Sequence, residues 1–183
     1  GNSFAGWSIT FAEEVLNKKI KELYGIEEFE LENYPLYFWV KATDTFGNVS
    51  DAVSVCLNVI PNGDKPTLKF SYPKGGEILG GTIRITGTAN VLTSEIDGVY
   101  LRIDPAYDGT FDEDNWERQM AGLGYPITPG KGIPVDAGSK TNWSLTINKN
   151  KNMSGTIAVR AYAVSKKNKS TLSEIITFDI DQN

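Results

Sequence analysis

Acidic side chains are concentrated in one stretch of the chain, between residues 104 and 117. Hard cations such as Ca²⁺ bind several carboxylate and carbonyl oxygens of a single loop, and this stretch offers such ligands. The candidate calcium ligands are Asp104, Asp108, Asp112 and Asp114, with Glu113 and Glu117 close by. Their spacing does not follow the EF-hand pattern, which requires a third acidic ligand and an invariant Gly. A solvated acidic loop is the alternative interpretation.

Aromatic residues are interleaved with these acids and continue beyond them. The four rings that could bind a ligand are Tyr107, Phe111, Trp116 and Tyr125. Exposed on a loop over residues 104–125, they would form a stacking platform for sugar rings, as expected of a carbohydrate-binding accessory module. The alternative is that a long loop folds back and buries its own aromatic side chains.

Few residues could support catalysis. A carboxylate pair can act as acid and base in glycoside cleavage, but only in a cleft that raises one pKa, and no pattern here indicates such a cleft. The chain has no His and one Cys. An imidazole base, a His-based triad, an intrachain disulfide and a zinc site are therefore not expected. Cys56 is interpreted as an inert small residue on an outer strand face. We predict no enzyme activity and no cofactor other than calcium.

The bulk composition is that of an ordinary globular protein. Hydrophobic residues make up 40% of the 183 residues and charged residues 22%. The net charge of −5 disfavours a nucleic-acid partner, because phosphate binding requires a basic face. We find no apolar run of about 18 residues and no signal-peptide pattern, so no transmembrane segment is predicted in this sequence.

Two parts of the chain resemble each other. Trp143-Ser-Leu-Thr-Ile147 repeats Trp7-Ser-Ile-Thr-Phe11, residues 157–161 match 38–42, and residues 176–180 match 55–59. The last two pairs are 119 and 121 residues apart, whereas the first pair is 136 apart, which indicates an insertion in the earlier copy. The pattern predicts a repeat of roughly 120 residues, the size of one compact domain.

The insertion has a helical pattern over about residues 11–25. Thr10 and Glu13 have capping-box spacing, apolar residues follow at helical intervals, and Gly25 is a natural stop. Such a helix could dock a partner helix or cover the strand face of its own domain. Residues 7–11, 36–42 and 53–59 alternate as strands, and the last two form a hairpin with a turn at Asp44 and Gly47.

A short segment between Pro61 and Pro66 predicts a stiff domain boundary. We expect a first domain over residues 1–62 and a second over 63–183, which contains the long acidic and aromatic loop 104–140. The Trp of the second copy lies about 80 residues into its domain. We therefore expect the first domain to be the C-terminal part of a domain that begins before Gly1.

An incomplete first domain would expose one apolar strand face. Its residues are Ile9, Phe11, Phe38, Val40, Val55 and Leu57. So large an apolar surface is not expected to stay in water. The inserted helix, a separate piece bearing the missing strands, or another chain could cover it.

The second domain contains about seven short alternating strands, which predicts an antiparallel two-sheet sandwich. Gly87 interrupts one of them, which suggests a bulge or a close backbone approach. Its first half contains Tyr72-Pro-x-Gly75, then Gly80-Gly-Thr-Ile83-x-Ile85-x-Gly87-x-Ala89, then Ile96-x-x-Val99-x-Leu101-x-Ile103-Asp104. These motifs, with Ala42-x-Asp44-x-x-Gly47-Asn48-x-Ser50 of the first domain, resemble bacterial immunoglobulin-like domains, which are similar to fibronectin type III domains.

The resemblance implies an all-β, immunoglobulin-like antiparallel β-sandwich in two tandem copies, the first truncated at its N-terminus. It also implies a non-catalytic spacer, adhesive or ligand-presenting module of a bacterial cell-surface or secreted protein. Its partners would be further domains of the same chain and a surface protein or glycan, not nucleic acid. Asp44 has no counterpart in the second copy and is predicted to form turn hydrogen bonds.

Overall fold

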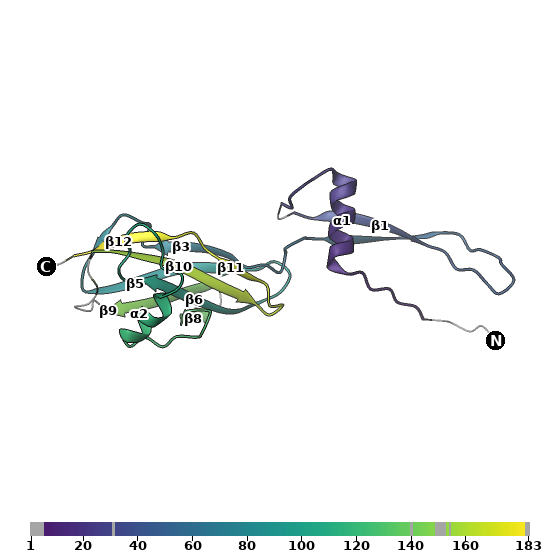
Figure 1. Cartoon of the computed structure of the whole chain (residues 1–183). Coiled ribbons are helices and arrows are strands. Elements are labelled where there is room, and N and C mark those ends of the chain that lie inside the picture. The colour runs from purple at the N-terminus through teal and green to yellow at the C-terminus, as the bar shows by residue number, and fades with distance from the viewer. Residues whose placement is uncertain (1–5, 31, 140, 149–152, 154, 182–183) are drawn as a thin grey trace. The chain divides into compact units, whose positions relative to one another are not determined.

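The computed structural model describes residues 6–30, 32–139, 141–148, 153 and 155–181 (Figure 1). The chain forms two compact units, residues 1–62 (unit 1) and 63–183 (unit 2). Unit 1 contains one helix and one hairpin, and unit 2 contains the remaining strands and a short helix.

Unit 1 consists of α1 (Glu13–Tyr24), β1 (Tyr34–Val40) and β2 (Val53–Val59). The helix ends at Gly25, whose φ of 65° is left-handed and whose N–H donates to the carbonyl of Lys21. Its N-cap is Ala12, without a side-chain cap, so the predicted capping box at Thr10 is wrong. The apolar stripe of α1 packs on the hairpin: Ile20 is buried with Tyr34 and Leu36.

Residues 7–11 are not a strand, contrary to the prediction from their alternating pattern. They form irregular chain, and Trp7 and Ile9 are about two-thirds exposed. In unit 2 the matching residues belong to β9 (Asn142–Asn148), which pairs with β5 (Thr82–Asn90). A strand forms only where a neighbour accepts and donates its backbone hydrogen bonds. Among the described residues of unit 1, nothing pairs with residues 7–11.

The β1–β2 hairpin pairs Tyr34 with Val59 and Val40 with Val53 in antiparallel register. Its connecting turn is fixed by Asp44, whose Oδ1 accepts from the backbone N–H groups of Phe46 and Asn48. The Oδ2 atom accepts from the side chain of Asn48. Asp44 therefore forms turn hydrogen bonds, as predicted.

Unit 2 consists of two sheets. The first contains β3 (Thr67–Tyr72), β5, β9 and β8 (Asp136–Ser139), in the order β3-β5-β9-β8. The second has the order β4-β12-β10-β6-β7, and β11 also pairs with β10. Its strands are β4 (Ile78–Leu79), β6 (Ile96–Asp104), β7 (Ile133–Pro134), β10 (Gly155–Ser165), β11 (Ser170–Leu172) and β12 (Ile176–Ile180). All pairs are antiparallel except β12 with β4.

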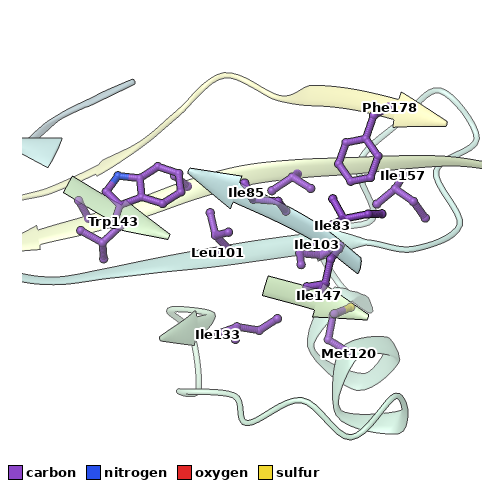
Figure 2. Packing of buried hydrophobic residues seen from close by; sticks show 14 of the residues in the cluster. Ile83, Ile85, Leu101, Ile103, Met120, Ile133, Trp143, Ile147, Ile157 and Phe178 are labelled. Carbon is purple, nitrogen blue, oxygen red and sulfur yellow. The ribbon is translucent and has the colours of Figure 1, made fainter. Parts of the chain in front are cut away.

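The inward side chains of both sheets form one buried core (Figure 2). Ile83, Ile85 and Ile147 contribute from the first sheet, and Leu101 and Ile103 from β6 of the second. The predicted antiparallel β-sandwich is therefore present in unit 2, and alternating apolar residues mark β3, β5, β6, β9, β10 and β12. The predicted loop 104–140 is not loop throughout, because β7 and β8 lie within it. In the described residues of unit 1 only the hairpin is a sheet, so the descent of both units from one repeat stays a prediction.

The matched strand pairs, β1–β2 and β10–β12, point the same residues to the apolar face but differ in pairing register. In unit 1 Phe38 pairs with Val55, whereas in unit 2 the matching residue Ile157 pairs with Phe178, two positions farther along its strand. A shift of two residues preserves the face to which each side chain points. The repeat therefore specifies the apolar face more strictly than the pairing partner.

Gly87 is the site of a close approach. It pairs with Trp143 across β5 and β9, and a Cβ on Gly87 would lie 2.1 Å from the Trp143 ring and 2.4 Å from the carbonyl oxygen of Lys69. The Trp143 ring also packs edge-on against Phe70. A side chain at position 87 would therefore displace the indole from the core.

We predict that Gly87→Ala destabilises unit 2 by about 3 kcal/mol, at the upper end of the range for overpacked cores. Urea unfolding followed by the fluorescence of the buried Trp residues would measure this loss. The matched control is Gly80→Ala, where the nearest atom to an added Cβ is 3.5 Å away and a change within about 0.5 kcal/mol is expected. Equal effects of the two substitutions would contradict the close approach.

A second prediction concerns pH. Hydrogen bonds from the Asn48 side chain and backbone lower the pKa of Asp44 below its ordinary value of 3.8. A carboxylate with a lowered folded pKa stabilises the fold above its unfolded pKa, and this stabilisation is lost as pH falls through the folded pKa. We expect the Asp44 carboxyl resonance to titrate below 3.8 by NMR, and the hairpin to weaken below that pH.

Asn48→Ala should return the Asp44 midpoint toward 3.8, because the substitution removes the side-chain donor. Asn58→Ala, in β2, should leave it unchanged. A midpoint that is insensitive to Asn48→Ala would show that this hydrogen bond does not hold the carboxylate.

Candidate functional site

The chemically richest segment, residues 105–132, connects β6 to β7 and contains α2 (Trp116–Gly122). We call it the excursion. Its aromatic residues Phe111 and Trp116 are buried against Ala158 of β10. Ala158 alternates with the core residues Ile157 and Val159, so it points to the opposite face of its sheet. The excursion therefore covers part of the outer face of the second sheet.

Two arginines attach the excursion to this face. Arg102 of β6 and Arg160 of β10 lie directly opposite each other. Like charges in such a cross-strand pair repel. Glu113 of the excursion forms ion pairs with both guanidinium groups, at 3.5 Å from Arg102 and at shorter range from Arg160. One carboxylate thus neutralises the repulsion and links the loop to two strands.

Arg102 and Arg160 make further contacts with the excursion. Arg102 donates to the carbonyl oxygens of Gly130 at 2.7 Å and Lys131 at 3.2 Å, near the end of the excursion. Its guanidinium carbon lies 5.3 Å from the centroid of the Trp116 ring. Arg160 lies over Phe111 in the same way, at 5.8 Å. The buried aromatic rings and the charges therefore form one cluster.

The acidic residues line a pocket of about 410 Å³ within the excursion. The wall includes the four aspartates proposed as calcium ligands: Asp104, Asp108, Asp112 and Asp114. The described residues nevertheless contain no group of three or more His, Cys, Asp or Glu side chains arranged to hold a metal ion. Calcium binding by these four aspartates therefore stays a prediction, although they line one pocket.

Two of these carboxylates, Asp104 and Asp112, accept several hydrogen bonds from the loop. Asp104 is fully buried, and its two oxygens accept from the backbone N–H groups of Ala106 and Asp112, at 3.1 and 3.0 Å. Asp112 accepts from Asn115 and from the side chain of Gln119. The acids therefore stabilise the path of the loop rather than converge on a common centre.

The four predicted ligand-binding rings do not form a platform. Phe111 and Trp116 are buried and present no ring face to a sugar. Tyr107 and Tyr125 are half-buried. The Tyr107 hydroxyl donates to the carbonyl of Gly109, and burial raises the pKa of Tyr125. The carbohydrate-binding interpretation of residues 104–125 is therefore wrong for its two central residues, because the loop folds over its own rings.

Among the described residues, the most exposed aromatic side chains lie instead in unit 1. Tyr37 and Trp39 project from the outer face of β1 and are 59% and 68% exposed. The exposed Cys56 of β2 faces Tyr37 across the hairpin. The alternating pattern had placed these residues on the face opposite to Phe38 and Val40, but it did not indicate that this face would stay open.

The arginine cluster was not predicted either. The available signal was that Arg102 and Arg160 occupy outward positions of two strands and that the first directly precedes the acidic stretch. Their adjacency depends on the strand order, which the spacing does not give.

The described helices are each too short, or not apolar enough, to cross a membrane. No protein-family model and no curated protein matches the sequence. The chain is similar in structure to the fibronectin(III)-like modules of Clostridium thermocellum CbhA, with a TM-score of 0.42 and 17% sequence identity. The match covers 82% of this chain and 63% of that one. No functional assignment rests on so distant a likeness.

We predict that Glu113→Gln destabilises unit 2 by about 1 kcal/mol, since the pair is partly exposed and screening limits its strength. The substitution leaves Arg102 and Arg160 opposed without a negative charge between them. The excursion should also become the first site of limited trypsin cleavage, at Arg118 or Lys131, as mass spectrometry would show.

Asp114→Asn is the matched control, because it removes a charge from the next exposed carboxylate of the same loop. It should change the free energy of unfolding by no more than about 0.5 kcal/mol. The tryptic cleavage pattern should be the same as that of the unmodified chain. If both variants behaved alike, net charge rather than the arginine cluster would hold the excursion.

Proposed function

We propose that the chain is a non-catalytic β-sandwich module that acts as a spacer or ligand-presenting unit of a bacterial cell-surface or secreted protein. The observation that carries the proposal is the path of the chain through unit 2. Gly63, at the start of the unit, accepts hydrogen bonds from Leu92 and Thr93, just beyond the end of β5. Asp181 donates to Leu79, just before β5 begins.

The chain therefore enters unit 2 at one end of β5 and reaches Asp181 at the other. The nine residues of β5 span about 30 Å at the rise of an extended strand. When the chain enters a module at one end and leaves it at the other, the module separates the segments before and after it by its own length. This geometry suits a spacer.

The chemistry of the excursion also supports a structural role. Glu113 and Asp104 hold the loop to the sheet and to itself, through the ion pairs and hydrogen bonds described above. Side chains that could act on a substrate are thus engaged in stabilising the fold. The resemblance of the sequence to immunoglobulin-like domains of bacterial surface proteins motivates the proposed location, which surface labelling of intact producing cells would test.

A spacer must transmit force through a single cooperative unit. We predict that unit 2, pulled by cysteine handles introduced as Lys65→Cys and Asp181→Cys in a Cys56→Ser background, unfolds in one rupture. The expected gain in contour length is on the order of 400 Å, from about 3.3–3.6 Å per residue. Single-molecule force spectroscopy on the full chain measures it.

The Gly87→Ala variant, pulled by the same handles, should unfold at lower force with the same gain. Extension of the unmodified chain without a rupture, or in several smaller steps, would contradict a spacer role for unit 2.

A further inference from the structure

Unit 1 leaves most of the exposed apolar surface of the chain uncovered. Of the 16 large hydrophobic side chains that are exposed in the described residues, 12 lie in unit 1. Some of them border a groove of about 600 Å³ on the inner face of the hairpin. We call it the hairpin groove, and its apolar lining on this face is Trp7, Ile9, Phe11, Phe38, Val40, Val55 and Leu57. Trp39, from the outer face, lies at its border.

Helix α1 covers only one end of this face. It buries Tyr34 and Leu36, at the start of β1, together with Ile20. Just before α1, Phe11 stacks on Phe38 with ring centroids 4.7 Å apart. The part of the hairpin face covered by the helix ends at this contact. Beyond it, Val53 and Val55 remain 65% and 42% exposed although they point to the same face as Leu36 and Phe38.

The backbone of the hairpin is also open. Among the described residues β1 and β2 pair only with each other, so each has a free edge. A free edge presents unpaired N–H and C=O groups that can bind another extended segment. An isolated two-stranded sheet is marginally stable, so an added strand would stabilise it.

In unit 2, the strand whose sequence matches β1 has a neighbour on both sides. Residues 38–42 match residues 157–161 of β10, and β10 lies between β12 and β6. On the β6 side, Val159 pairs with Ile103 and Ala161 pairs with Leu101. The corresponding edge of β1, next to Val40 and Ala42, is therefore the place for an antiparallel strand with apolar residues at alternate positions.

The size of the surface favours one strand over a globular partner. The exposed parts of Trp7, Ile9, Val53, Val55 and Leu57 amount to on the order of 500 Å². Each partner in a stable protein complex of standard size buries about 800 Å². A second copy of the chain would have to add contacts outside this face to reach that area. A single extended segment can be covered by this face alone.

We propose that unit 1 binds an extended peptide segment in trans, as a β-strand added antiparallel to the free edge of β1, with alternate aliphatic side chains in the hairpin groove. The backbone of β1 supplies the affinity, and the groove selects a segment that is apolar at every second position. This inference does not depend on the spacer role of unit 2.

The test uses the full chain and a synthetic peptide with the sequence of residues 95–105, which contains β6. Calorimetry should detect binding, and hydrogen exchange should show new protection at the amides of β1 around Trp39 and Lys41. A peptide in which Val99, Leu101 and Ile103 are replaced by Ser should bind at least about tenfold more weakly, because it cannot fill the groove.

Two variants of the chain locate the site. Val55→Lys places a charge on the groove face and should weaken binding by at least about tenfold. Ser54→Lys places the same charge on the opposite face of β2 and should leave binding within about twofold. Circular dichroism shows that each variant is folded before binding is measured.

Three results would overturn the proposal. The first is absence of binding at about millimolar peptide. The second is protection confined to unit 2, which would mean that the peptide replaces β6 there. The third is protection of β1 that appears without peptide, rises with protein concentration and is lost in Val55→Lys; sedimentation would then identify a second copy as the occupant.

Discussion

One carboxylate, placed between two opposed arginines, links the excursion of unit 2 to its second sheet. Arg102 and Arg160 are forced together because β6 and β10 are neighbours in the sheet. Two guanidinium groups side by side would disfavour this pairing, and Glu113 removes the repulsion by binding both. The same contact fixes the excursion, which in turn buries Ala158 under Phe111 and Trp116. Strand pairing, charge and loop packing are therefore mutually dependent in this unit.

The acidic residues of the excursion have a structural role that their density alone does not indicate. Its carboxylates have the residue types and density of a cation site, yet they are directed at backbone N–H groups of the same loop. A carboxylate that accepts such bonds stabilises the turn of the chain. The density of acids therefore reflects the demands of a long connection on a crowded sheet face.

Unit 1 and unit 2 place similar sequences in different environments. Trp143 lies in the middle of a sheet and is buried against Gly87 and Phe70, whereas Trp7 lies in irregular chain and is exposed. The difference follows from backbone pairing: β5 and β8 flank β9, and no described segment flanks residues 7–11. Among the described residues of unit 1, an open apolar face and an open edge occur together, because no further strand lies beside the hairpin.

The sequence by itself determined the local features of this protein. Period-two alternation located the long strands of unit 2, helical spacing and Gly25 located α1, and Asp44 was correctly assigned to its turn. These features depend on neighbours along the chain, which the sequence contains. The tertiary structure alone decided that residues 7–11 are not a strand, that Phe111 and Trp116 are buried, and that Arg102, Arg160 and Glu113 meet. Each of these outcomes depends on which strands lie side by side, and alternation specifies the face of a residue without specifying its neighbour across the sheet.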